Sequence, residues 1–167
     1  EQLPDPELRE VLRAAASEAA SFTDRFHAEV WLTDMSRRLA RQVEDPEERI
    51  ELLTLVHMEA ARVELPPELI LAVIEVESNF DRYAVSVAGA LGLMQIMSFW
   101  IDEIGRPDDN LLHTTTNLRY GCTILRFYYD KEKGDLRRAL GRYNGSLGSR
   151  KYPNKVIDKL YYKWFKA

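Results

Sequence analysis

The stretch "VIEVESNFDRYAVSVAGALGLMQIM", residues 73–97, begins as an apolar helix and then runs into small residues and glycines. Glu77 stands where the apolar residues end and the small residues begin. Glu77 follows Val73 and Ile74 by about one helical turn, so it projects from an apolar face. Removal from water raises the pKa of a carboxyl group and keeps it protonated near neutral pH. The stretch therefore predicts a general acid at the end of a buried helix.

A second glutamate, Glu75, lies on the same predicted helix but points to another side. It follows Glu68 by about two turns, so the two carboxylates share one edge of the helix. We interpret this edge as polar and solvated. We therefore expect the substitution Glu75→Gln to have a mild effect on activity.

The residues that follow Glu77 are suited to line a ligand site. Gly89 and Gly92 permit close approach of the backbone, and Gln95 offers an uncharged donor and acceptor. Soft apolar walls and flat faces for sugar rings come from Met94, Met97, Phe99, Trp100, Tyr143 and Tyr152. Each feature alone is more common in a core, so only their combination points to a site.

The rest of the chain has helical periodicity. Apolar spacing and capping residues predict helices over 5–20, 23–43, 44–63, 66–78, 92–105, 115–134, 135–144 and 155–165. Residues 79–91 predict a loop or a short extended ribbon. No segment alternates at period two for long enough to form a sheet of any size. The fold class is therefore mainly α. We expect a helical extension over 1–62 that packs on a catalytic domain over 63–167.

Two of these helices show their apolar faces and caps plainly. In the segment 23–43 we assign Phe26, Val30, Met35 and Leu39 to the buried face. In the segment 44–63 Asp45 is the predicted N-cap and Pro46 the first helical residue. The buried positions expected there are Leu52, Leu53, Val56 and Ala60.

Charge is distributed unevenly along the chain. The net charge is −4, but residues 1–60 hold 7 basic and 14 acidic residues, whereas residues 141–167 hold 7 basic residues and 1 acidic residue. The basic end favours an anionic partner or a solvated helix face. Overall acidity argues against nucleic acid. No apolar run reaches the roughly 18 residues that cross a bilayer.

Cysteine and histidine usage indicates no metal or disulfide chemistry. Cys122 is the only cysteine, so no internal disulfide can form, and its helical context predicts a buried structural thiol. His27, His57 and His113 lack the close spacing of metal ligands. We assign no metal and no cofactor.

Three blocks of the sequence carry a specific resemblance. "ESNFDRYAVSVAGALGLMQIM" (77–97), "NLRYGCTIL" (117–125) and "ALGRYNGS" (139–146) occur in this order with suitable gaps. Together they resemble the catalytic module of the soluble-lytic-transglycosylase (SLT) type found in lytic murein transglycosylases. The resemblance covers roughly residues 63–165 and implies a goose-lysozyme-like helical fold.

The resemblance implies roles for individual residues. Glu77 corresponds to the single catalytic acid and base, with Ser78 and Gly92 as supporting positions. Sugar-binding positions of the family match Ser86, Gln95, Met97, Tyr143 and Asn144, and Tyr143 is expected to hydrogen-bond near the catalytic carboxyl group. The sequence departs from the family pattern at Arg82, at Ser98 and at Gly148, where proline, proline and a second glutamate are common. These departures leave subsite preference open.

The implied substrate is the β-1,4 bond between N-acetylmuramic acid and N-acetylglucosamine in peptidoglycan, with 1,6-anhydro ends as products. With one carboxylate in the signature, assistance from the substrate's own N-acetyl group is expected, and Asp81 and Asp102 are the nearest alternatives for a second acid. A hydrolytic muramidase of the same fold and a non-catalytic wall-binding or assembly module are the rival readings.

The expected location is the periplasm or cell envelope. Because the chain starts at Glu1 rather than Met, we expect an export signal or lipid anchor to have been removed. Glycan strands are the expected partner, and we expect a monomer. The basic end leaves room for contact with a membrane surface or an envelope assembly.

Overall fold

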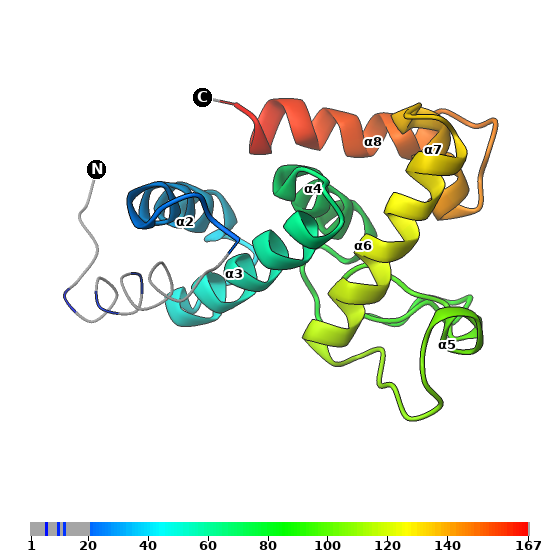
Figure 1. Cartoon of the computed structure of the whole chain (residues 1–167), viewed down its shortest axis with the longest axis horizontal. Coiled ribbons are helices and arrows are strands. Elements are labelled where there is room, and N and C mark those ends of the chain that lie inside the picture. The colour runs from blue at the N-terminus through cyan, green and yellow to red at the C-terminus, as the bar shows by residue number, and fades with distance from the viewer. Residues whose placement is uncertain (1–5, 7–9, 11, 13–20, 167) are drawn as a thin grey trace.

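The computed structural model describes residue 6, residue 10, residue 12 and residues 21–166. The described part is mainly helical, as predicted, with only isolated β-bridges between its loops. Its elements are α2 (Arg25–Leu39), α3 (Pro46–Arg62), α4 (Pro67–Ser78), α5 (Phe99–Ile104), α6 (Thr114–Lys131), α7 (Leu136–Asn144), α8 (Lys151–Lys159) and the π-helix η1 (Leu160–Trp164) (Figure 1). The helix predicted over 5–20 lies largely outside the described residues.

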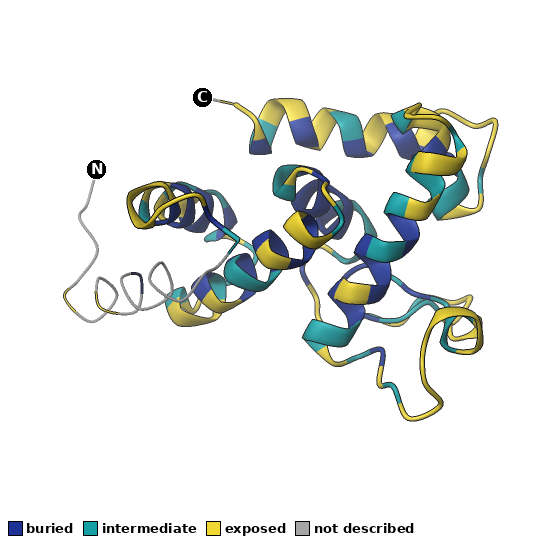
Figure 2. Ribbon diagram, in the orientation of Figure 1, coloured by how far each residue is buried: buried dark blue, intermediate teal, exposed yellow. Residues whose placement is uncertain are grey.

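Helix α4 forms the centre of the core. Pro67 stands at its first position, and Asn79 ends it in the left-handed conformation, with φ of 50°. Every residue from Leu69 to Glu75 is buried (Figure 2). Its neighbours are α3 on one side and α8 with η1 on the other (Figure 1). From Leu69 to Ile74 the helix is apolar on every side, which fits a segment that is covered on every side.

Helices α2 and α3 both begin at an aspartate N-cap, of which Asp45 was predicted, but they differ in how well their faces were predicted. The Asp24 side chain accepts a hydrogen bond from the His27 amide, and Asp45 accepts one from the Glu47 amide. The expected core positions of α3 are all buried. On α2, however, Phe26 and Val30 are 76% and 53% exposed.

The buried face of α2 consists of Ala28, Trp31, Leu32, Met35, Ser36 and Leu39. On this face the Trp31 indole Nε1 donates to the Glu68 carboxylate of α4 at 3.0 Å, which joins α2 to the central helix. The assignment of Phe26 and Val30 to the core was therefore wrong, whereas that of Met35 and Leu39 is confirmed.

The helix predicted over 92–105 is shorter than expected and starts at Phe99. The preceding residues form a tight loop in which Leu91 and Ile96 exchange both backbone hydrogen bonds. Gly92 and Gln95 have φ of 74° and 54°, values that a right-handed helix excludes. The loop over 79–91 is as predicted, with bridges from Leu91 to Val85 and to Ile96.

The C-terminal helix starts at Lys151, before the predicted residue 155. Pro153 lies in its first turn, where the amide would lack an intrahelical partner in any case. The segment η1 is bonded to α2, because the Arg38 guanidinium donates to the carbonyls of Lys163 and Trp164 at 2.6 and 3.2 Å.

Glu75 joins the same junction and is not the solvated residue that the sequence predicted. It is 8% exposed. Its carboxylate accepts hydrogen bonds from Gln42 at 2.8 Å, Lys163 at 2.8 Å and Trp164 at 3.1 Å. These donors come from the segment after α2 and from η1, so Glu75 ties these two segments to α4. The division into units over 1–62 and 63–167 stays a prediction.

Candidate active site

Glu77 lies in the last turn of α4 and is half-buried. Its Oε2 accepts a hydrogen bond from the Tyr152 hydroxyl at 2.9 Å. Burial raises the pKa of Glu77 to about 7, and the hydrogen bond from Tyr152 opposes this rise. A carboxyl group with a pKa near neutrality can release a proton and take one back at the same pH.

Tyr152, from α8, is the tyrosine that contacts Glu77. Its side chain is buried, and burial together with the charge of Glu77 raises its pKa well above the usual value. The hydroxyl therefore stays neutral and remains a donor. The sequence assigned this position to a flat sugar-binding face, and the 75 residues that separate it from Glu77 gave no signal of their contact.

Tyr143, from α7, was expected to hydrogen-bond near the catalytic carboxyl group. Its hydroxyl instead donates to the carbonyl of Met94 at 2.7 Å. Burial and then the charge of Glu77 raise the pKa of Tyr143 well above the usual value. The charge of Glu77 thus acts on Tyr143. The Tyr143 hydroxyl, however, is hydrogen-bonded to the 92–97 loop and not to the Glu77 carboxyl group.

The supporting residues Ser78 and Gly92 fix that loop against α4 and α6. The Ser78 hydroxyl donates to the carbonyl of Leu93 at 2.8 Å. A Cβ on Gly92 would lie 2.5 Å from the Asn117 side chain, so no larger residue fits there. Both positions are therefore needed for the close packing of the loop beside Glu77.

Asn117 is a structural residue of the site that the sequence reasoning did not single out. Its Oδ1 accepts from the Met94 amide at 2.8 Å, and its Nδ2 donates to the carbonyls of Leu91 and Leu111 at 2.9 and 2.7 Å. One turn later on α6, a Cβ on Gly121 would lie 2.2 Å from the sulfur of Met94. The spacing of Asn117 and Gly121 in the "NLRYG" block was the available signal.

A hollow of about 290 Å³ opens beside Glu77. Its lining comes from the ends of α4 and α7, the loop between α7 and α8, and the first turns of α8. The lining residues are Val76, Glu77, Asn144, Ser146, Ser149, Lys151, Tyr152 and Lys155. We refer to it as the Glu77 hollow. Of the residues that the sequence placed at the site, it brings together Glu77, Asn144 and Tyr152. Ser146, Ser149 and the two lysines were not predicted.

The predicted sugar-binding residues Ser86, Gln95 and Met97 do not line the Glu77 hollow. The Ser86 hydroxyl accepts from the Ala90 amide at 2.9 Å. The Gln95 side-chain amide donates to the carbonyls of Gly92 and Ala84 at 2.9 and 3.2 Å. Met97 is half-buried. The polar groups named here serve the conformation of the loop that begins where α4 ends.

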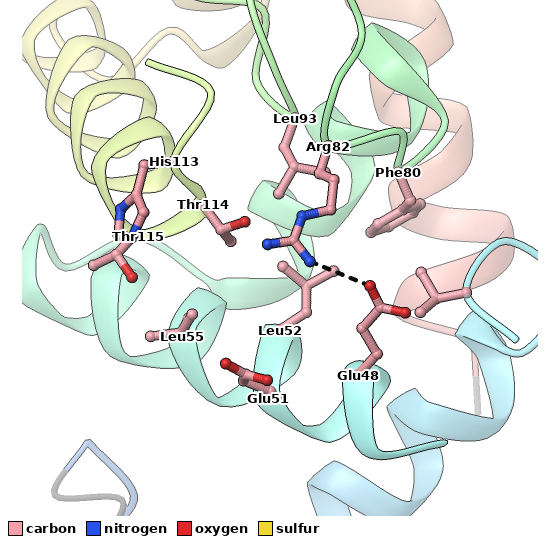
Figure 3. Close-up of a pocket in the computed structure, with 11 residues that line it drawn as sticks. Glu48, Glu51, Leu52, Leu55, Phe80, Arg82, Leu93, His113, Thr114 and Thr115 are labelled. Carbon is pink, nitrogen blue, oxygen red and sulfur yellow. Dashed lines mark hydrogen bonds and ion pairs between the residues drawn. The ribbon is translucent and has the colours of Figure 1, made fainter. Parts of the chain in front are cut away.

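A second, smaller pocket of about 120 Å³ lies between α3 and the start of α6 (Figure 3). Arg82 reaches across it to Glu48, with 3.2 Å between Nη1 and Oε1. Both side chains are nearly half exposed, so this ion pair adds little to stability. The pocket shares no lining residue with the Glu77 hollow.

Other residues considered from the sequence lie outside this site. Cys122 is fully buried, and burial raises the pKa of its thiol, which fits the structural role predicted for it. Phe99 is 53% exposed on α5, beside Trp100. Among the described residues no group of three or more His, Cys, Asp or Glu side chains could hold a metal ion.

The structure thus defines a helical domain with one half-buried, near-neutral carboxyl group at the edge of a polar hollow. The family profile of the transglycosylase SLT domain matches residues 54–165. The chain belongs to this family.

Curated relatives and a solved structure agree. A transglycosylase of Enterobacteria phage PRD1 is 31% identical over 108 residues, 60% of this chain and 40% of that protein. Membrane-bound lytic murein transglycosylase C of Yersinia pestis is 33% identical over 113 residues, 58% of this chain and 32% of that protein. The chain therefore spans well under half the length of these relatives.

An inactive mutant of the lytic transglycosylase Slt from Pseudomonas aeruginosa matches the fold with a TM-score of 0.52 and 23% identity. The match covers 89% of this chain and 31% of that one. It confirms the helical fold that the sequence predicted.

Proposed function

We propose that this chain is a lytic transglycosylase that cleaves the β-1,4 bond between N-acetylmuramic acid and N-acetylglucosamine in peptidoglycan. The observation that carries the proposal is the Glu77 carboxyl group, which has a pKa of about 7 and borders a polar hollow. Membership of the SLT family and the names of the relatives support the same activity.

In the first step protonated Glu77 donates its proton to the oxygen of the glycosidic bond as that bond breaks. The transition state at the anomeric carbon has oxocarbenium-ion character. The oxygen of the substrate's own N-acetyl group stabilises this carbon, since among the described residues no second carboxylate lines the Glu77 hollow. Asp81 and Asp102 were the alternatives, and both are exposed side chains outside that hollow.

In the second step ionised Glu77 takes the proton from the C6 hydroxyl of the same muramic residue. The C6 oxygen then attacks C1 and closes the 1,6-anhydro ring, so no water is consumed. One group serves as acid and then as base, which requires a pKa near the working pH. The Tyr152 hydroxyl orients the carboxylate between the two steps.

We further propose that Asn144 contacts the sugar directly, together with Ser146 and Ser149 on the same wall. Ser86, Gln95, Met97 and Tyr143 would contribute through the loop that they shape or hold at the rim of the substrate groove. Under this proposal the carbonyl of Met94, fixed by Tyr143, keeps that loop at a constant distance from α7.

We propose the cell envelope as the location, in line with the name of the Yersinia relative. None of the described helices is long and apolar enough to span a membrane. The finer assignment to the periplasm, the monomeric state and the absence of a nucleic-acid partner are likewise proposals.

Mass spectrometry of digested peptidoglycan tests the proposed function. A lytic transglycosylase releases fragments with 1,6-anhydro ends, which are lighter by one water than the reducing ends that a muramidase releases. We expect anhydro ends from the wild-type chain and none from Glu77→Gln at equal concentration. Reducing ends alone would favour the muramidase, and glycan binding without any fragments would favour a wall-binding module.

A further inference from the structure

The Glu77 hollow has a positively charged side that the catalytic proposal does not use. Lys151 and Lys155 lie one turn apart on α8, and both line the hollow. Both residues are exposed. Of the described residues that line the hollow, Glu77 alone is acidic, and the Tyr152 hydroxyl already contacts its carboxylate.

The two lysines differ from the others on the same C-terminal segment. Lys163 pairs with Glu75 at 2.8 Å, and Lys159 lies 3.9 Å from the same carboxylate. Within the part of the chain that the structure describes, no carboxylate forms an ion pair with Lys151 or Lys155. Two ammonium groups are therefore available at the hollow for an anionic partner.

The substrate class of the proposed function supplies such a partner beside the reacting bond. Muramic acid carries a lactyl arm on the sugar ring whose C1 reacts. In a peptide-free residue this arm ends in a carboxylate, and otherwise it carries a stem peptide with carboxylates of its own. A lysine side chain is a flexible point charge, which suits a carboxylate whose position varies with the peptide.

We propose that Lys151 and Lys155 bind carboxylates borne on the lactyl arm of the muramic residue at the cleavage site. This inference rests on the proposed function for the identity of the sugar. The two lysines are specificity residues: they select anionic strands and hold the muramic residue at the hollow, while Glu77 performs the chemistry.

A binding experiment tests the inference without relying on cleavage. The Glu77→Gln chain is compared with the same chain carrying Lys151→Gln and Lys155→Gln. Three preparations of glycan strands serve as probes: native strands, strands stripped of peptides by an amidase, and native strands whose carboxylates have been converted to amides with carbodiimide and ammonia. A matched control carries Lys131→Gln and Lys166→Gln, two exposed lysines outside the hollow.

We expect the double exchange at 151 and 155 to weaken binding of native strands by about three- to tenfold, as two partly exposed ion pairs would. It should not change binding of amidated strands, and the control pair should leave both unchanged. Added salt should reduce the difference. A loss on stripped strands identifies the lactyl carboxylate as the partner, and a loss confined to native strands identifies the stem peptide.

Equal losses on native and amidated strands, or an equal loss in the control pair, would overturn the inference. Failure of the proposed function has a different signature, because the wild-type chain would then release no anhydro ends from any of the three preparations. In the wild-type background the exchange at 151 and 155 should raise KM on native strands while kcat changes little.

Discussion

Glu75 and Glu77 lie two residues apart on α4, and their carboxylates meet opposite surroundings. Glu75 accepts hydrogen bonds from three side chains of two distant segments and is nearly closed off from water. Glu77 accepts one, from Tyr152, and borders an open hollow. Glu75 therefore joins α4 to two distant segments, whereas the Glu77 carboxylate lies at the edge of the hollow beside the Tyr152 hydroxyl.

The difference teaches how one helix can serve structure and chemistry at once. Burial raises the pKa of Glu77 to about 7, because the hydrogen bond from Tyr152 offsets only part of the rise. On the other side, Trp164 links the Glu75 cluster to the exit of α4, because its ring lies 5.9 Å from that of Phe80. Phe80 has a φ of 66°, a strained value for an aromatic residue that surrounding packing must maintain.

The largest expected difference between substitutions of the two glutamates is in the rate of cleavage. Glu77→Gln keeps the size of the side chain and removes the transferable proton. Loss of a general acid and base typically reduces the rate by about 10²–10⁴-fold. Release of anhydro ends per mole of folded chain measures it, and we expect Glu75→Gln to keep most of its activity under the same normalisation. A Glu77→Gln chain that retained more than a few per cent of turnover would remove Glu77 from the mechanism.

How much of this the sequence could predict depends on where the partners of each residue lie. The apolar face around Glu77 is local, because Val73 and Ile74 are within one turn, so its raised pKa was predictable. The partners of Glu75 come from residue 42 and from residues 163–164, far along the chain. Its apparent polar edge shared with Glu68 was therefore misleading.

The fold shows the same division between local and distant information. The bounds of helices α3, α4 and α7 were predicted well, since the periodicity and the end residues that determine them lie within each segment itself. The start of α5 was misplaced because Asn117, more than 20 residues later, holds the preceding loop out of a helix. The contact between Tyr152 and Glu77 also depends on the packing of α8 against α4.

The next largest expected effect is on stability. Here Glu75→Gln should have the larger effect and Glu77→Gln the smaller one. Glu75→Gln keeps one oxygen acceptor but removes the charge that faces Lys163. Because Lys163 is 26% exposed, it regains part of its hydration, so we expect a loss of about 1–3 kcal/mol in the free energy of unfolding. Urea denaturation at pH 7 measures it, with Glu77→Gln as the matched substitution. A loss no larger than that of Glu77→Gln would mean that the Glu75 cluster does not hold the two segments.

The third expected effect is a change in the stability of the folded chain with pH. Glu77 has a pKa of about 7 in the folded chain and an ordinary value of 4.5, so between these values the folded state holds a proton that the unfolded chain releases. Its contribution to stability is complete below pH 4.5 and is lost as the pH rises through 7. Relative to Glu77→Gln, we expect the wild-type chain to lose about 1–3 kcal/mol between pH 5 and pH 8. Urea denaturation of both chains at the two pH values measures it, and an unchanged difference would contradict the buried state of the acid.

The smallest expected effect concerns the hydrogen bond that Tyr152 donates to Glu77. The Tyr152 hydroxyl lowers the pKa of Glu77, so Tyr152→Phe should raise it, by up to about one pH unit. The protonated acid then persists to higher pH, and the alkaline limb of the kcat/KM profile should move upward by the same amount. Tyr143→Phe is the matched control, because its hydroxyl contacts the carbonyl of Met94 instead, and its profile should keep the wild-type limb. If both variants moved the limb equally, the shift would report general loosening of the site, and the direct contact between Tyr152 and Glu77 would not be what sets the working pH.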